Sequence, residues 1–292
     1  MSDLNIIEFA DWSEYELLDT GNKLKLERFG DCVTIRSEPK AWWKPKRPEL
    51  WGKADCRYFD DDKKNSAWKF YGKPHAPVMS YGNIKFHTKF MNGSKHLGVF
   101  PEQEPHWRYI ARSKSYATLA KPKLLNLFAY TGAATLVAAN AGFAVTHVDA
   151  SKPSVDWARQ NQHSSALDGA PIRWLVDDAL KFVQRQVRRG ERYDAIIMDP
   201  PAFGRGPKNE LWKLEKMLPE LLQSCSQILA ERPIFVLLTL YNIEASPIMA
   251  ANILEEYFGK IPGFRVQAGE LALSAKNGYP LPLSIWGRAE FR

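Results

Sequence analysis

The sequence has few cysteines and no long apolar run, and each of these absences argues against a class of protein. Three cysteines, an odd and widely spaced set, occur among the 292 residues, at Cys32, Cys56 and Cys225. This number and spacing argue against a disulfide framework or a zinc knuckle, and we expect a reducing cytoplasm and no bound metal. Apolar runs such as Ile234–Leu238 are too short to cross a bilayer. The first residues, Met1–Asn5, have no basic segment leading into an apolar one, so we expect neither a secretory signal nor a membrane partner.

The net charge of +7 is a modest basic excess, but part of it is concentrated in one window. Residues 40–89 contain twelve Lys or Arg against five Asp or Glu, together with four tryptophans, Trp42, Trp43, Trp51 and Trp68. Cations interleaved with flat aromatic rings are typical of surfaces that bind unstacked RNA. The alternative is that the tryptophans form the core of a small domain and the lysines its solvated face. Composition alone leaves both open.

The centre of the chain has the pattern of one βαβ unit. An apolar strand is predicted over Leu124–Phe128 and ends at a Tyr-Thr-Gly turn. A helix is predicted over Ala133–Asn140, with Gly142 as its left-handed cap. A second apolar strand, Phe143–Val148, leads into Asp149. Strand, glycine turn, helix, strand and acid in this order are typical of a nucleotide-binding sheet.

The turn of this unit indicates what kind of nucleotide would bind. Its one glycine, Gly132, lets a ligand lie close to the backbone, but the three-glycine fingerprint for a pyrophosphate is missing. Asp149 stands where an acid can accept both hydroxyls of a ribose. A ligand with a ribose and no pyrophosphate, such as S-adenosylmethionine, therefore fits better than a nicotinamide dinucleotide. An ordinary βαβ unit with a structural acid is the plain alternative.

Further alternation of helices and strands extends the unit into a large domain. Strands are predicted over 173–176, 193–198 and 234–240, helices over 153–167, 179–189, 210–229 and 247–257, and a closing antiparallel hairpin over 264–273 and 282–291. Such alternation predicts an α/β fold with a doubly wound, mostly parallel sheet. We place this domain at residues 96–292. Residues 1–95 are predicted to form a smaller β-rich domain that could bind substrate, in which Ala41–Trp51, with two prolines, is an ordered loop pinned by its tryptophans.

A second acidic loop follows the predicted strand 193–198. It reads Asp199-Pro-Pro-Ala-Phe203. The two prolines remove backbone donors and stiffen the loop, which leaves carbonyls and the Asp199 carboxylate as acceptors beside the Phe203 ring. Because both Asp149 and Asp199 follow parallel strands, they can face one cleft. A planar amine or a nucleobase would suit this set, although Asp-Pro-Pro alone can also be only a stiff turn.

Taken together, these motifs resemble the class I S-adenosylmethionine-dependent methyltransferases, and among them the bacterial methyltransferases of large-subunit ribosomal RNA (the cytosine-C5 and guanine-N7 group). The resemblance rests on Asn126–Gly132, Asp149, Asp178–Ala179, Asp199–Phe203, Trp157–Asn161 and Gly98–Gln103, and it extends over about residues 80–292. It implies an enzyme that binds S-adenosylmethionine and has RNA, above all ribosomal RNA, as its partner. A nicotinamide-dependent oxidoreductase and a non-catalytic RNA-binding protein of the same fold remain alternatives. Neither the target nucleotide nor the oligomeric state follows from the sequence.

The resemblance also implies a role for individual residues. The turn Tyr130–Gly132 would hold the methionine portion of the cofactor, Asp149 the ribose, and Asp178 with Ala179 the adenine. Asp199, Pro200 and Phe203 would form the methyl-transfer end. The full set that the resemblance assigns to the cofactor is Phe100, Gln103, Asn126, Phe128, Tyr130, Thr131, Gly132, Asp149, Ala150, Ser151, Asn161, Asp178, Ala179 and Asp199.

Three departures from the family pattern bear on the substrate. Gln103 is followed by Glu104-Pro105 where the family continues with an arginine, and no RNA-binding domain of the usual N-terminal kind is recognisable. The cytosine-C5 enzymes of the group have a cysteine after the fifth strand, where this chain reads Leu238-Thr-Leu-Tyr-Asn242. Methylation at C5 of a pyrimidine needs a thiolate that adds to C6, whereas methylation of a nitrogen needs no covalent step. We therefore favour a nitrogen target over a carbon target.

Overall fold

The computed structural model describes residues 5–8, 12–60, 66–73, 75–116, 120–276 and 278–292. The chain packs into two compact units. The larger unit consists of residues 1–7, 106–271 and 284–292, and the smaller unit of residues 8–105 and 272–283. The boundary predicted at residue 95 thus lies upstream of the division at residue 105, and the sequence pattern did not separate residues 272–283 from the strands around them.

The larger unit is built on a sheet of eight strands in the order β1-β16-β17-β15-β12-β9-β10-β11. Strands β9, β10, β11, β12 and β15 are paired in parallel, whereas β17 is antiparallel to β15. The strands of this sheet are β1 (Asn5–Glu8), β9 (Lys123–Leu127), β10 (Ala144–Asp149), β11 (Ile172–Val176), β12 (Ala195–Met198), β15 (Phe235–Tyr241), β16 (Phe264–Ser274) and β17 (Pro280–Phe291). The sheet is the doubly wound, mostly parallel one that the sequence predicted.

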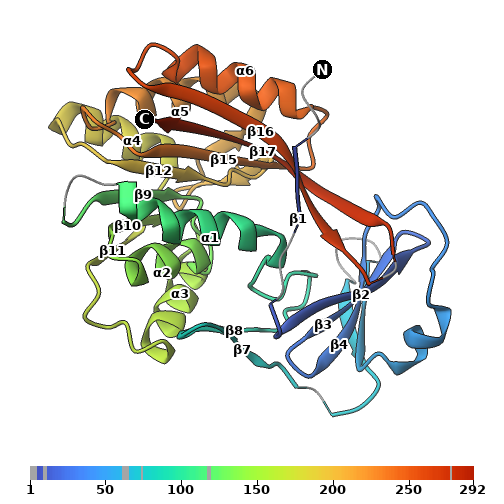
Figure 1. Cartoon of the computed structure of the whole chain (residues 1–292). Helices are drawn as coiled ribbons and strands as arrows, with labels where there is room; N and C mark the ends of the chain where they lie inside the picture. The colour runs from blue at the N-terminus through green and yellow to red at the C-terminus, as the bar shows by residue number, and fades with distance from the viewer. Residues whose placement is uncertain (1–4, 9–11, 61–65, 74, 117–119, 277) are drawn as a thin grey trace. The chain divides into compact units, whose positions relative to one another are not determined.

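Helices cover both faces of this sheet (Figure 1). On one face lie α4 (Ala179–Arg189), α5 (Leu214–Gln227) and α6 (Pro247–Phe258), whose apolar side chains form one buried cluster with alternate residues of β9, β12 and β15. On the other face lie α1 (Glu104–Ser113), α2 (Ala133–Asn140) and α3 (Lys152–Ser164). Strands that are apolar on both faces, such as β12 with all four residues buried, fit this position between two helical layers. No helix of the described residues is long and apolar enough to cross a membrane.

The predicted start of one helix in the larger unit is wrong. The sequence predicted a helix from Glu210, but residues 203–213 form a small antiparallel hairpin of β13 (Phe203–Arg205) and β14 (Leu211–Lys213), and α5 begins only at Leu214. The hairpin closes because the N–H of Gly206 donates to the Glu210 carbonyl at 2.7 Å and Asn209 adopts a left-handed φ of 68°. Trp212 is 3% exposed and its Nε1 donates to the Pro201 carbonyl at 2.7 Å, which anchors β14 to the proline loop.

The smaller unit is rich in β-structure, as predicted. It has a five-stranded sheet in the order β2-β3-β4-β5-β6 and a two-stranded sheet of β7 and β8. All pairs are antiparallel except β4 with β5. The strands are β2 (Tyr15–Gly21), β3 (Leu24–Phe29), β4 (Cys32–Ser37), β5 (Cys56–Phe59), β6 (Ala67–Phe70), β7 (Val78–Tyr81) and β8 (Ile84–His87). Two short 3-10 helices of this unit are η1 (Pro48–Lys53) and η2 (Pro101–Gln103), and the larger unit has η3 (Lys114–Tyr116).

Candidate functional site

The acidic residues singled out from the sequence follow adjacent strands of the large sheet. In the parallel register Leu127 of β9 lies between Val148 of β10 and Met198 of β12. The next residues along these strands are Phe128, Asp149 and Asp199, so the glycine turn, the first acid and the proline loop all begin at one edge of the sheet. The carboxyl edge of a parallel sheet is where ligands bind in this architecture.

The turn after β9 has an unusual backbone. Phe128 and Tyr130 have left-handed φ values of 56° and 47°, and Gly132 has a φ of 83°. Left-handed φ values in side-chain-bearing residues cost on the order of 1–3 kcal/mol each and are concentrated at ligand sites. A Cβ added to Gly132 would lie 2.9 Å from the Cβ of Ala158 in α3, so the glycine also allows close packing of the turn on that helix. The turn therefore holds a strained shape at the sheet edge.

The Asp149 carboxylate is fixed by backbone donors from two loops. Its Oδ2 accepts from the N–H of Tyr130 and its Oδ1 from the N–H of Ser151, each at 2.8 Å. The side chain is half-buried, and this burial raises its pKa although the two hydrogen bonds act in the opposite direction. Because each carboxylate oxygen can accept more than one hydrogen bond, both oxygens keep acceptor capacity for a ligand. Ala150, next to it, is also half-buried.

Two asparagines of the predicted set support the turn from within the protein. Asn161 is 1% exposed, and its Nδ2 donates to the Thr131 carbonyl at 3.0 Å. Asn126 is 2% exposed, and its Nδ2 donates to the Thr135 Oγ1 at 2.9 Å. Both contacts fix the shape of the turn and of the start of α2.

A buried histidine completes this support, and the sequence reasoning missed it. The Thr135 Oγ1 also lies 2.9 Å from Nδ1 of His147, which is fully buried in β10. Burial, with a smaller effect of Arg159, lowers the pKa of His147 to about 3, so the ring is neutral. A polar residue in an otherwise apolar strand was the available signal. Asn126, Thr135 and His147 form one chain of side chains beneath the turn.

The acids after β11 have local structural roles. Asp178 is the N-cap of α4, where its Oδ1 accepts from the Lys181 N–H at 2.9 Å, and Ala179 is the first, buried residue of the helix. A Cβ added to Gly206 of the hairpin turn would lie 3.1 Å from Asp178 Oδ2, so the hairpin passes close to this carboxylate. Asp177 forms an ion pair with Arg185. A role of Asp178 and Ala179 at an adenine ring remains a prediction.

The Asp199-Pro-Pro loop leads directly into the β13–β14 hairpin. Asp199 is half-buried, Pro200 is buried, and the Phe203 side chain is 57% exposed. The Trp212 ring packs against Phe128 with 4.9 Å between ring centroids, which joins this loop to the glycine turn. The hairpin is tied to α4 by an ion pair of 3.0 Å between Lys181 and Glu210. The two predicted loops are thus parts of one packed surface.

The remaining predicted residues lie in the smaller unit. Phe100 and Gln103 belong to the segment of η2, where the Gln103 N–H donates to the Phe100 carbonyl at 3.0 Å. Their place over a cofactor remains a prediction. In the basic window 40–89 the side chain of Trp68 is buried and that of Trp51 half-buried, whereas Trp42 is 82% exposed. Residues 61–65 and 74 of the window are outside the described part of the chain.

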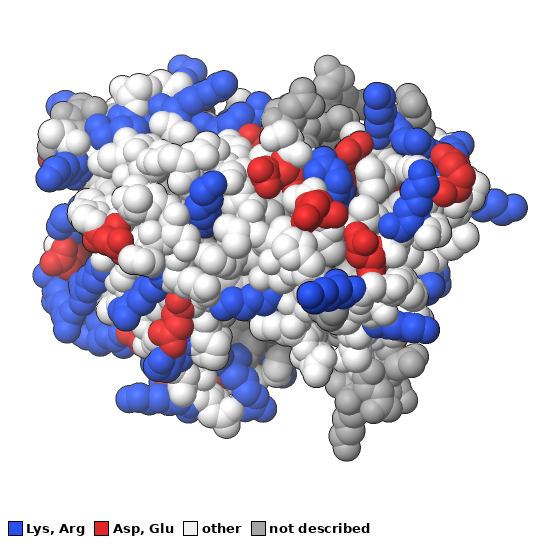
Figure 2. All heavy atoms as spheres, turned by 90° about the horizontal axis from the view of Figure 1, so that it is seen from below, with Lys and Arg blue, Asp and Glu red and all other residues white. Residues whose placement is uncertain are grey.

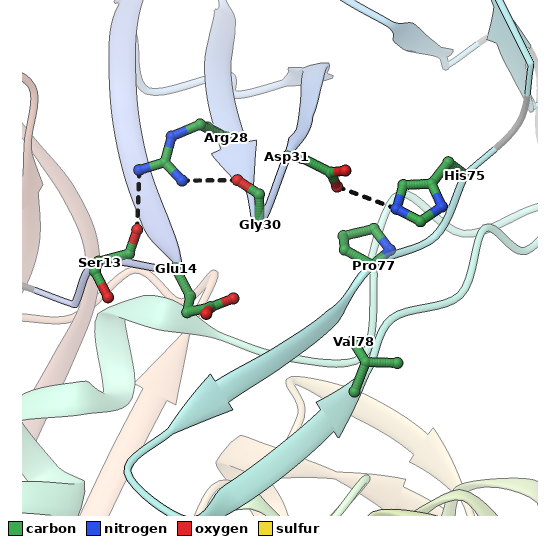
Figure 3. Close-up of a pocket in the computed structure, with 8 residues that line it drawn as sticks. All are labelled: Ser13, Glu14, Arg28, Gly30, Asp31, His75, Pro77 and Val78. Atoms are coloured by element: carbon green, nitrogen blue, oxygen red, sulfur yellow. Dashed lines mark hydrogen bonds and ion pairs between the residues drawn. The ribbon is translucent and has the colours of Figure 1, made fainter.

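A surface hollow in the smaller unit is a poor candidate for the site. It is lined by eight residues, among them Arg28, Asp31 and His75, and none of the predicted residues lines it (Figure 3). The Arg28 guanidinium already donates to the carbonyls of Gly30 and Ser13, and His75 lies 3.1 Å from Asp31. Arg28, Asp31 and His75 therefore already have partners within the protein.

The cysteines do not contribute to the sheet edge. Cys225 is fully buried on α5, with Sγ 3.9 Å from Sδ of Met198, and burial raises the pKa of its thiol. Cys32 and Cys56 are buried in the smaller unit. Among the described residues no group of three or more His, Cys, Asp or Glu side chains is placed to hold a metal ion.

The chain is similar to known methyltransferases over its whole length. A family profile described as S-adenosylmethionine-dependent methyltransferase matches residues 98–237. The crystal structure of the S-adenosylmethionine-dependent methyltransferase from Agrobacterium tumefaciens superposes with a TM-score of 0.94 at 39% identity, covering 98% of this chain and 93% of that one.

Shorter matches connect the chain with ribosomal RNA enzymes. Ribosomal RNA large subunit methyltransferase K of Neisseria meningitidis is 32% identical over 121 residues, which are 41% of this chain and 34% of that protein. Ribosomal RNA large subunit methyltransferase I of Klebsiella pneumoniae is 38% identical over 128 residues, which are 44% of this chain and 30% of that protein. The chain thus matches only about a third of the length of these curated relatives.

The residues at the sheet edge fit S-adenosylmethionine. The Asp149 carboxylate is oriented by two backbone N–H groups and keeps acceptor capacity for two ribose hydroxyls. α2 begins directly after Gly132, and the positive end of a helix favours a carboxylate. The sheet edge thus combines an oriented carboxylate on Asp149 with the positive end of α2.

Proposed function

The chain belongs to the S-adenosylmethionine-dependent methyltransferases, and we propose that it methylates a base in RNA, with large-subunit ribosomal RNA as the first candidate. The nicotinamide alternative is excluded by this membership. The observation that supports an RNA substrate is the similarity to two enzymes named for ribosomal RNA, at 32% and 38% identity over 121 and 128 residues. A cytoplasmic location, where such RNA is made, goes with this proposal.

We assign cofactor binding to Asp149 and the turn after β9, and methyl transfer to the loop that begins at Asp199. Asp149 would accept the ribose hydroxyls and the Tyr130–Gly132 backbone would bind the amino-acid end, with Asn161 and Asn126 keeping the turn in shape. When bound, the cofactor supplies a methyl group on a sulfonium, which a nucleophile can attack directly. Asp199 would accept a hydrogen bond from the attacking amine, orient its lone pair and take up the proton that the nitrogen releases. The exposed ring of Phe203 would lie against the target base.

We infer a nitrogen target because the edge lacks a thiol. In the described part of the chain β15 ends in Leu240 and Tyr241 and is followed by Asn242, with no cysteine. Cys225 is buried among apolar side chains with a raised pKa, so it is neither accessible nor readily ionised. Attack by a nitrogen lone pair needs only alignment and acceptors, which the Asp199 loop provides.

The test combines cofactor binding with analysis of RNA. Isothermal titration should show binding of S-adenosylhomocysteine and none of NAD. Mass spectrometry of ribosomal RNA nucleosides from a strain without the gene should show one methylated nucleoside lost, restored by the wild-type gene but not by an Asp199→Ala copy. Cofactor binding without any lost nucleoside in ribosomal, transfer or messenger RNA would overturn the RNA proposal. Absence of methyl transfer to any substrate would support the non-catalytic alternative.

A further inference from the structure

A strap of the smaller unit, residues 41–51, is fixed by one buried carboxylate. Asp19 is 2% exposed, and in the strap it accepts hydrogen bonds from the backbone N–H groups of Lys46 and Arg47 and from Trp51 Nε1, at 2.8–3.1 Å. It also accepts from the N–H of Thr20 at 2.9 Å. A buried carboxylate with four donors holds those donors in place, because loss of any one leaves the charge less well compensated.

The first half of the strap is fixed to the β2–β3 hairpin. The N–H groups of Asn22 and Lys23 donate to the carbonyls of Trp43 and Ala41, both at 2.7 Å. Trp43 Nε1 donates to Thr20 Oγ1 at 2.9 Å. A Cβ on Gly21 would lie 2.4 Å from the backbone nitrogen of Pro45, so the strap lies directly against the hairpin. The strap is therefore an ordered element, as the sequence predicted, and its surface side chains are presented on a rigid backbone.

The strap presents aromatic rings and amines to solvent. Trp42 is 82% exposed, and the one polar atom of its side chain, Nε1, donates to the Pro39 carbonyl at 2.8 Å. Beside it in the sequence, Trp43 packs against the exposed ring of Tyr279, with 5.7 Å between centroids. The amine of Lys46 lies 4.5 Å from the centroid of the same Tyr279 ring, and Lys44 is exposed. The acidic residue of the strap, Glu49, is paired with Arg47 at 3.4 Å.

The strap does not differ from the rest of the protein surface in its charge alone. It differs in its combination of exposed aromatic rings and lysines. Figure 2 shows Lys and Arg side chains interspersed with Asp and Glu over one face of the protein. Isolated exposed apolar residues are common and need no ligand. A nearly fully exposed tryptophan on a rigid backbone, next to a Tyr–Lys pair and a further lysine, is different. It offers a stacking platform together with neutralising charges.

We propose that the strap binds an unpaired segment of the RNA substrate, with a base stacked on Trp42 and phosphates neutralised by Lys44 and Lys46. The inference rests on the proposed RNA substrate and assigns a surface that recognises it. Flat aromatic faces bind any unstacked base, whereas a duplex keeps its bases inside, so the strap selects single strands. A rigid platform favours binding because little conformational entropy is lost when the base stacks.

The experiment measures fluorescence anisotropy of a labelled oligouridine of about 10 nucleotides, within the 4–16 nucleotides usual for such surfaces. Trp42→Ala should weaken binding about 5- to 140-fold, which is 1–3 kcal/mol at 1.4 kcal/mol for each factor of ten. Trp42→Phe should recover most of the affinity. Lys44→Ala with Lys46→Ala should reduce the slope of log affinity against log salt by about 1.4, from 0.7 for each phosphate on a single strand.

A second aromatic–lysine pair of the same unit provides the matched control. Tyr71 is 52% exposed next to β6, with Lys69 Nζ 5.8 Å from its ring centroid. Tyr71→Ala with Lys69→Ala should leave both affinity and salt slope unchanged. If the two control substitutions weaken oligouridine as much as Trp42→Ala does, or if an RNA duplex binds as tightly as the single strand, the strap assignment is wrong.

Cofactor binding and methyl transfer separate this proposal from the proposed function. Trp42→Ala should bind S-adenosylhomocysteine as wild type does. If the wild type methylates RNA but Trp42→Ala binds oligouridine equally well, the strap assignment falls and the function stands. If Trp42 is needed for oligouridine binding but no RNA is methylated, the strap assignment is supported and the proposed RNA methylation is wrong.

Discussion

The Asp149 Oδ2 atom accepts a hydrogen bond of 2.8 Å from the backbone N–H of Tyr130, and this contact joins the two loops that follow β9 and β10. Tyr130 has a left-handed φ of 47°, so the donor points at the carboxylate only while the turn keeps its strained shape. The acid that would bind a ribose thus also stabilises the turn that would bind the other end of the cofactor. Changes on either side of this hydrogen bond should affect the same binding step.

Asp149→Asn should weaken binding of S-adenosylhomocysteine about 10- to 140-fold, that is by about 1.5–3 kcal/mol, the contribution of hydrogen bonds to a charged group. An amide has one acceptor oxygen, so one of the two backbone donors from Tyr130 and Ser151 would face an NH₂ group. Isothermal titration of both proteins with S-adenosylhomocysteine measures the change in affinity. Asp156→Asn is the control, because Asp156 on α3 is exposed and forms an ion pair with Lys152 of the same helix. Equal affinity of wild type and Asp149→Asn would contradict the ribose assignment.

Gly132→Ala should lower both the free energy of unfolding and the affinity for S-adenosylhomocysteine. The new Cβ would lie 2.9 Å from the Cβ of Ala158, and the φ of 83° strains any side-chain-bearing residue. The two causes can be separated. Ala158→Gly in the same protein removes the steric contact but leaves the backbone strain of on the order of 1–3 kcal/mol. Chemical denaturation should therefore show a partial rescue in the double variant, and full rescue would mean that the left-handed conformation is not needed.

Local sequence patterns predicted the βαβ core well because each element there has its own periodic signal. The helix over Ala133–Asn140 has the same bounds in the sequence prediction and in the structure, and the strands on either side agree closely. The β13–β14 hairpin was missed because its strands have three residues each, too few for a period to show. The start of α5 was misplaced for the same reason.

Contacts between distant residues could not be predicted from such patterns. Asn161 bonds to Thr131, 30 positions away, and Asp19 bonds to Trp51, 32 positions away. The first contact shows that a residue assigned by resemblance to the cofactor set supports the turn from behind. The second contact, from Trp51 to Asp19, holds Trp51 inward, whereas Trp42 is exposed. The composition of the window could not predict which tryptophan is exposed.

His106→Phe should stabilise the protein, and more so in acid. His106 is 1% exposed, packs edge-on against Trp286, and its two ring nitrogens have no hydrogen-bond partner among the described residues. Burial lowers its pKa to about 3, with Arg288 acting in the same direction. Because the unfolded chain takes up a proton below about pH 6.5 and the folded chain only near pH 3, stability is lost as the pH falls through this window.

The size of this effect can be measured by urea denaturation at two pH values. Phenylalanine keeps the ring contact and takes up no proton, so the gain over wild type should increase by about 2 kcal/mol between pH 7.5 and about pH 5, at 1.36 kcal/mol for each pH unit below about 6.5. His163→Phe is the control, because the His163 side chain on α3 is 82% exposed. A variant less stable than wild type at both pH values would show that the His106 nitrogens have a partner that the phenylalanine loses.

The last prediction is that methyl transfer depends on Asp199 and on no cysteine. Asp199 follows β12 at the sheet edge, while the groups assigned to the ribose and the turn follow β10 and β9. Asp199→Ala should therefore still bind S-adenosylhomocysteine through the ribose and adenine contacts but lower single-turnover methylation by about 100-fold or more, the usual scale for loss of one preorganised polar group. Phe203→Ala should instead weaken the RNA substrate, by about 1–3 kcal/mol if a base stacks on its ring.

Cys225→Ser distinguishes the two chemistries. Cys225 is fully buried with its Sγ 3.9 Å from the Met198 Sδ, and burial raises its pKa, so a thiolate there is disfavoured and cannot meet a base. Serine at this position should lower the free energy of unfolding by about 1–3 kcal/mol, since it buries a hydroxyl among apolar groups, while the rate of the folded enzyme stays near that of wild type. Loss of transfer in folded Cys225→Ser, or a covalent RNA adduct to wild type that denaturing gels retain, would contradict the nitrogen target. A thiolate would then have to add to the pyrimidine ring, and α5, which contains Cys225, would have to move until the thiol reached the base.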